Sequence, residues 1–143
     1  MRLKTTFRYW IYAVFSVLLA TGAAWLVADW QKDADEAWQQ ASASLLMIHG
    51  GAAMLALMAL GALVPLHLLR AWHARKNLVS GITVAAVNAM LIVTAFGLYY
   101  LGSETVRPWM SWIHIGAGFF LALMLPLHIL LGRRARAFTQ TAR

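Results

Sequence analysis

Residues 114–128 read HIGAGFFLALMLPLH, an apolar run that begins and ends with a histidine. A related run, HGGAAMLALMALGALVPLH, covers residues 49–67. Both contain Leu-Ala-Leu-Met, and both close with Pro-Leu-His. An ionisable side chain inside a membrane helix is costly, and it usually marks a functional site. Four histidines in matching positions therefore need a shared explanation.

The composition around these runs is that of a small integral membrane protein. The chain has 143 residues, of which 62% are hydrophobic and 12% are charged, whereas a soluble domain carries about 25% charge. In lipid, backbone groups must be paired inside the spanning segment, which favours helices. We therefore predict an all-α, integral membrane four-helix bundle with up-down-up-down topology, as a single domain over residues 1–143. Four stretches reach the length of about 20 residues that a bilayer requires: 9–28, 45–69, 78–101 and 109–131. The longest connection, 29–44, is expected to be either a short surface helix or a solvated loop.

The charge pattern predicts the orientation. Ten of the twelve lysines and arginines lie before the first span, in the second loop or in the C-terminal tail. All five acids lie in the other two loops, together with Lys32 and Arg107. The positive-inside rule then places both termini in the cytoplasm. The net charge of +7 follows from this topology, and since the basic residues form no recognisable binding module, no nucleic-acid ligand is expected.

The spacing of the histidines favours a haem site. His49 and His67 are 18 residues apart, or five whole turns, and share a helix face. His114 and His128 are 14 apart, about 40° short of four turns. Because these two helices run in the same direction, His49 and His114 would meet near the outer surface and His67 and His128 near the inner one. Two facing neutral imidazoles can supply both axial ligands of a haem iron. The chain has no cysteine, so any haem would be bound non-covalently.

Five further residues are candidates for haem binding. Gly51 and Gly118 follow the outer histidines, and Gly22 and Gly97 are expected at the same depth. Glycine lets a flat macrocycle approach a helix backbone, although small residues are also ordinary packing positions in membranes. Arg107 is the only arginine on the outer side and would pair with a haem propionate.

The histidine pattern, together with the segment LYYLGSE at residues 98–104, resembles the four-helix cytochrome b superfamily. In particular it resembles small bacterial cytochrome b561-like membrane proteins and the related DUF4405-type domains, over most of the chain. The resemblance implies two b haems stacked across a bacterial inner membrane. It also implies electron transfer between membrane quinone or quinol and a redox protein partner or larger complex.

The first histidine pair departs from that pattern. Its 18-residue gap spans ~27 Å, against ~21 Å for the 14-residue gap in the last helix, a difference of one turn. A kink at Gly61 and Pro65 would absorb part of the difference. If the rest is not absorbed, only one haem binds.

Two other classes of function remain open at this stage. One is a haem-free structural subunit of a larger membrane complex, and the other is a small metal or ion transporter that uses the histidines as transient ligands. Asp29 and Glu36 would supply carboxylates for a non-haem metal near the outer level. The chain has no nucleotide or phosphate motif and no catalytic set, so any enzymatic role would be that of a quinone-linked oxidoreductase or one of its subunits.

Overall fold

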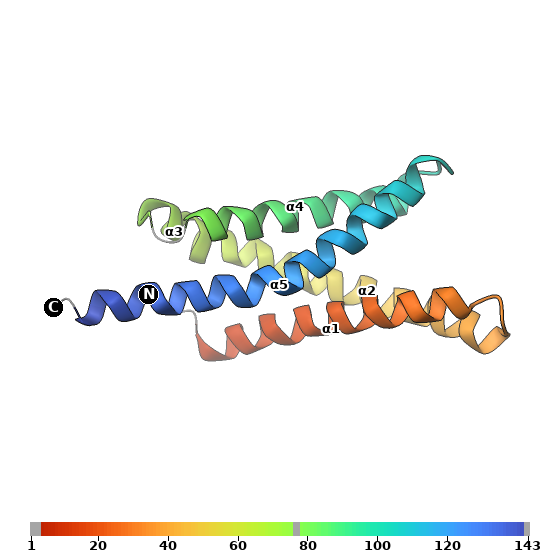
Figure 1. The fold of residues 1–143 in the computed structure, drawn as a ribbon, viewed down its shortest axis with the longest axis horizontal. Coiled ribbons are helices and arrows are strands. Elements are labelled where there is room, and N and C mark those ends of the chain that lie inside the picture. The colour runs from red at the N-terminus through yellow and green to blue at the C-terminus, as the bar shows by residue number, and fades with distance from the viewer. Residues whose placement is uncertain (1–3, 76–77, 142–143) are drawn as a thin grey trace. The chain divides into compact units, whose positions relative to one another are not determined.

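A computed structural model describes residues 4–75 and 78–141, and it confirms the all-α fold class (Figure 1). No strand occurs among these residues. The elements in chain order are α1 (Thr5–Gln31), α2 (Glu36–Leu63), a π-helical turn η1 (Val64–Leu68), α3 (Leu69–His73), α4 (Leu78–Tyr100) and α5 (Val106–Thr141).

Four helical segments in the described part of the chain are long and apolar enough to cross a membrane, as predicted. They are Thr5–Gln31, Glu36–His73, Leu78–Tyr100 and Val106–Arg134. Each contains one of the four stretches predicted from the sequence, except that the third ends at Tyr100. The large apolar side chains on these segments are widely exposed, for example Met54 at 70%, Phe96 at 64% and Leu123 at 75%. Such surface is stable in contact with lipid, and the chain is therefore a multi-pass membrane protein.

Residues 29–44 form neither the separate surface helix nor the solvated loop that the sequence predicted. Helix α1 continues to Gln31, and α2 already begins at Glu36. The carboxylate of Asp35 accepts a hydrogen bond from the backbone N–H of Trp38 at 3.0 Å. This N-cap satisfies one of the donors that a helix start leaves unpaired, and so it starts α2 earlier than the apolar pattern indicates. Most of the segment belongs to α1 and α2, and only a short turn joins them.

The chain divides into two compact units, with the boundary between His67 and Leu68. The first unit is an antiparallel hairpin of α1 and α2. Its interface buries Ile11 and Val14 on α1, and Ala52, Ala56 and Ala59 on α2. These positions recur every three or four residues, so they form one face of each helix, and the alanines let the two backbones approach closely.

The second unit contains the hairpin of α4 and α5. Helix α4 buries Ser80, Val87 and Thr94, which are spaced by seven residues, and α5 buries Ala117 and Leu121. A seven-residue repeat keeps side chains along one seam of a helix. Here the seam of α4 contains two hydroxyl side chains.

The two Pro-Leu-His tripeptides differ in backbone. Pro65 and His67 lie inside the π-turn η1, whereas Pro126 lies inside the continuous α-helix α5. Proline has no N–H to donate and crowds the carbonyl four residues earlier. The irregularity expected at Pro65 is therefore present, in the form of a wide turn with i→i+5 hydrogen bonds.

Candidate histidine sites

His49 is held by a hydroxyl group in the interface of the first hairpin. A hydrogen bond of 3.0 Å joins His49 Nδ1 on α2 to Thr21 Oγ1 on α1. Thr21 continues the seam of α1, because it lies seven residues after the buried Val14 and seven before the buried Ala28. His49 lies three residues before the buried Ala52. The imidazole is therefore part of the helix–helix seam.

Gly22 lies against the same ring. A Cβ atom added at Gly22 would lie 3.3 Å from Cε1 of His49 and 3.6 Å from Nδ1. The ring edge that contains these two atoms is thus in close contact with the α1 backbone. Thr21 and Gly22 together fix both the position and the rotation of the imidazole.

His114 is held in the same way in the second hairpin. Its Nδ1 lies 2.8 Å from Oγ1 of Thr94 on α4. Thr94 is 3% exposed, and the contact as a whole is part-buried. In both hairpins, a threonine on the first helix contacts the histidine on the second through the same ring nitrogen.

A third pair lies at the other end of the second hairpin. His128 Nδ1 is 2.9 Å from Oγ of Ser80, and a Cβ atom at Gly81 would lie 3.8 Å from Cε1 of His128. Ser80 and Gly81 therefore lie against the ring of His128 as Thr21 and Gly22 lie against the ring of His49. The hydroxyl-glycine dipeptide occurs at both places in the sequence.

The two pairs of the second hairpin share one antiparallel register. Ser80 and Thr94 are 14 residues apart on α4, and His114 and His128 are 14 residues apart on α5. Fourteen residues are two heptads, which return a side chain to the same seam. Arg107 lies a further seven residues before His114 in the first turn of α5, and its side chain is exposed. Arg107 is therefore on nearly the same face of α5 as His114, two turns closer to the helix start.

His67 has a different environment, because it lies in the π-turn and its side chain is exposed. The predicted shared face of His49 and His67 assumed an uninterrupted α-helix. A π-turn takes up one extra residue, which shortens the axial separation by ~1.5 Å and delays the helical phase by up to ~100°. The π-turn thus removes part of the extra length between His49 and His67. It also means that the prediction of a common helix face for these two histidines does not hold beyond Val64.

The predicted glycines have different surroundings. Gly97 is buried, and a Cβ atom there would lie 3.3 Å from Leu101 and 3.4 Å from the sulfur of Met110. This glycine serves the packing of α4 against α5. At Gly51 and Gly118 an added Cβ would meet no atom within 4 Å, so the backbone at these two positions is open to a flat ligand.

Three hydroxyl partners of the histidines are not predicted from the sequence pattern: Thr21, Ser80 and Thr94. A signal for them exists on α4, because the 14-residue spacing of its two hydroxyls equals that of the histidines on α5. The fifth histidine, His73, is an exposed residue at the end of α3, and its Nδ1 donates to the Leu69 carbonyl at 2.6 Å.

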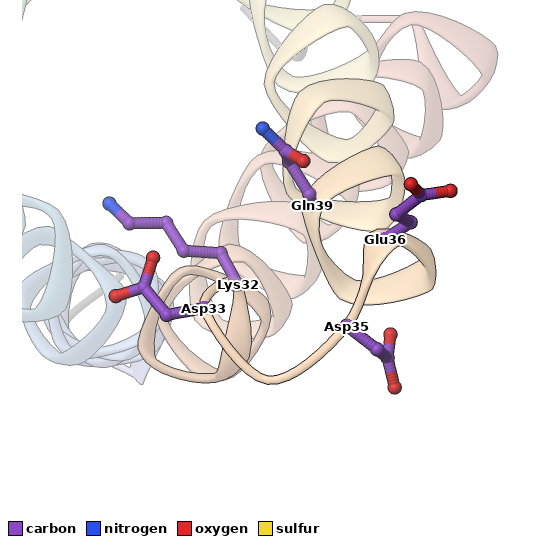
Figure 2. Close-up of a pocket in the computed structure, with 5 residues that line it drawn as sticks. All are labelled: Lys32, Asp33, Asp35, Glu36 and Gln39. Carbon is purple, nitrogen blue, oxygen red and sulfur yellow. The ribbon is translucent and has the colours of Figure 1, made fainter.

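The hollows in the described residues offer no comparable ligand set. A polar hollow of about 480 Å³ lies at the α1–α2 turn, and Figure 2 shows the carboxylates of Asp35 and Glu36 pointing away from Lys32 and Asp33. Within either hairpin, no three histidine or carboxylate side chains of the described residues gather into one metal-binding cluster. Asp29 is instead paired with Lys32 at 3.0 Å on the surface. Comparisons with models of known families, with curated proteins and with solved structures found no match to this chain.

Proposed function

We propose that this chain is a b-type cytochrome that transfers electrons across a bacterial inner membrane. In this proposal His49 and His114 bind one haem near the outer surface, and His67 and His128 bind a second haem near the inner surface. The assignment of histidines to the two haems rests on their order and spacing in the sequence. Both termini lie in the cytoplasm in this arrangement, as the distribution of basic residues indicates.

The observation that supports the proposal most strongly is the repeated hydroxyl–imidazole contact. In each of the three contacts, the hydroxyl lies against Nδ1 of the histidine. A hydrogen bond between membrane helices is worth on average only about 0.6 kcal/mol. A charged side chain in hydrocarbon costs several times more than this, so the imidazoles are expected to be neutral. Neutral imidazoles held in the same way at three places need a shared purpose, which metal binding provides.

The residues present also fit a haem chemically. Neutral imidazole is a common axial ligand of haem iron, and histidines that bind metals usually engage their second ring nitrogen in a hydrogen bond. The open backbone at Gly118, four residues after His114 and on nearly the same helix face, leaves room for a macrocycle next to that histidine. Exposed Arg107 supplies a positive charge two turns from His114 for a propionate.

Haem iron, when bound, supplies one-electron redox chemistry. The chain itself would position the two irons, exclude water and set the local polarity. His114 and His128 lie towards opposite ends of the apolar span Val106–Arg134, which suggests electron passage between two levels, since a carrier that reacts on one side needs only one level. Quinone or quinol in the lipid and a redox protein or larger complex are the proposed partners.

Two measurements on purified full-length protein test this proposal. A reduced-minus-oxidised spectrum with haem counted per chain should show bis-histidine b haem, with two per chain expected. In liposomes that contain a quinol, both haems should become reduced and then be reoxidised by an acceptor on one side. Haem-loaded protein that exchanges no electrons with quinols or quinones would refute the quinone role.

A second candidate is a haem-free structural subunit, because the three contacts also join helices within each hairpin. In that case the protein would purify without haem. Substitution of His114 by Asn, which keeps a hydrogen-bonding group, would also leave folding and assembly intact.

A further inference from the structure

The two threonines that contact histidines also contact backbone carbonyls of their own helix. Thr21 Oγ1 lies 2.7 Å from the Val17 carbonyl oxygen and 3.3 Å from that of Leu18. Thr94 Oγ1 lies 2.8 Å from the Met90 carbonyl and 3.1 Å from that of Leu91. The same pattern thus occurs in both hairpins, with each hydroxyl positioned between a carbonyl one turn earlier and an imidazole on the neighbouring helix.

A hydroxyl has one proton to donate. At 2.7–2.8 Å the contact with the carbonyl has the length of a good O–H···O hydrogen bond. A carbonyl oxygen has no proton, so the hydroxyl is the donor in this bond. The remaining contact, from Oγ1 to Nδ1 of the imidazole, then needs its proton from the ring, which makes Nδ1–H the donor and the hydroxyl the acceptor.

We propose that Thr21 and Thr94 are positioning residues that hold His49 and His114 in the Nδ1–H tautomer. In a neutral imidazole with its proton on Nδ1, the lone pair is on Nε2, the nitrogen that then binds a metal. The rigid hydroxyl and the ring contact at Gly22 set the direction in which His49 presents Nε2.

The hydrogen-bond chain also affects the electronic character of the ligand, and this part rests on the proposed haem function. An acceptor at Nδ1–H makes the imidazole more basic. Each acceptor is itself polarised by donating to a carbonyl, and hydrogen bonds in such a chain strengthen one another. A more basic ligand favours ferric over ferrous iron. Thr21 and Thr94 should therefore lower the reduction potential of the haem bound by His49 and His114.

The test replaces each hydroxyl and then restores it. Thr21→Val and Thr94→Val remove the hydroxyl while keeping a β-branched shape, and Thr21→Ser and Thr94→Ser return a hydroxyl. Thr83→Val is the matched control, because the Thr83 hydroxyl on α4 donates to the Val79 carbonyl at 3.0 Å. The haem bound through His128 serves as an internal reference in every variant.

Redox titration of the full chain should show the potential of one haem rising in both valine variants. The serine variants should return it towards the value of the unmodified protein, and the potentials in Thr83→Val should not change. The ¹⁵N chemical shifts of the imidazoles in haem-free protein provide a second readout. His49 and His114 should be protonated at Nδ1 in the unmodified chain, and in each valine variant the affected ring should become a tautomer mixture.

Unchanged tautomers and unchanged potentials in both valine variants would overturn the inference, as would Nε2–H tautomers in the unmodified chain. Absence of haem from the unmodified protein would refute the proposed function alone. In that case the ¹⁵N measurement still decides whether the two threonines set the tautomer.

Discussion

Both hairpins hold histidines by contacts with hydroxyl groups, but the contacts are more regularly spaced in the second hairpin than in the first. In the α4–α5 hairpin, two hydroxyl–imidazole pairs recur at 14-residue intervals on both helices. In the α1–α2 hairpin, His49 forms such a pair, whereas His67 lies within a π-turn. The two Pro-Leu-His tripeptides therefore lie in different backbone, a π-turn in the first hairpin and a continuous α-helix in the second. A repeated sequence motif therefore does not guarantee a repeated structure.

The largest effects should come from the histidines themselves. We expect His114→Ala and His128→Ala each to remove a different haem, so that haem per chain falls by about half in each. His49→Ala should match His114→Ala, and His67→Ala should match His128→Ala, because a haem with one axial histidine is held weakly. Haem content and the reduced-minus-oxidised spectrum of each variant provide the comparison.

The His67→Ala variant tests whether the two hairpins contribute equally to haem binding. His67→Ala protein that retains both haems with unchanged spectra would show that the first hairpin contributes one ligand only. Retention of two haems by both His49→Ala and His114→Ala would exclude the outer site as assigned.

The proline substitutions should have intermediate and unequal effects. Pro65→Ala restores the missing N–H and removes the ring that disturbs the helix, so η1 should become α-helical and the phase of His67 should change. Pro126→Ala leaves α5 a continuous helix and His128 against Ser80. We therefore expect Pro65→Ala to reduce the occupancy of the inner haem more than Pro126→Ala does. Haem titration measures this difference, and equal affinities in the two variants would contradict a role for the π-turn.

The smallest predicted difference concerns the two glycines beside the rings. Alanine is favoured over glycine in a helix interior by roughly 0.5–1 kcal/mol. At Gly81 an added Cβ lies at an ordinary contact distance of 3.8 Å, but at Gly22 it lies 3.3 Å from His49 and the ring has to shift. Gly81→Ala should therefore stabilise the protein more than Gly22→Ala. Thermal unfolding of both variants in the same detergent tests the order, and a higher unfolding temperature for Gly22→Ala would contradict it.

The helical content and the four spans could be predicted because apolar length has few structural solutions in lipid. The start of α2 could not, since it depends on one capping contact between Asp35 and Trp38 rather than on hydropathy. Among the site residues, the histidines stood out because they are ionisable. Thr21 and Thr94 did not, because a threonine in a membrane helix commonly bonds to its own backbone. The 14-residue spacing of Ser80 and Thr94 is a sequence signal for Thr94, whereas Thr21 is identified only by its contact with His49 in the structure.

The 14-residue separation of His114 and His128 has an electrical consequence. Along the axis of α5 these residues are ~21 Å apart, about two thirds of a hydrocarbon core of ~30 Å. One elementary charge that crosses the whole core at 100 mV changes energy by about 2.3 kcal/mol. The electrostatic energy of an electron moved between the levels of these two histidines would therefore change by about 1.5 kcal/mol at a transmembrane voltage of 100 mV. The resting voltage of the cell would then bias the direction of transfer, with no moving part in the protein.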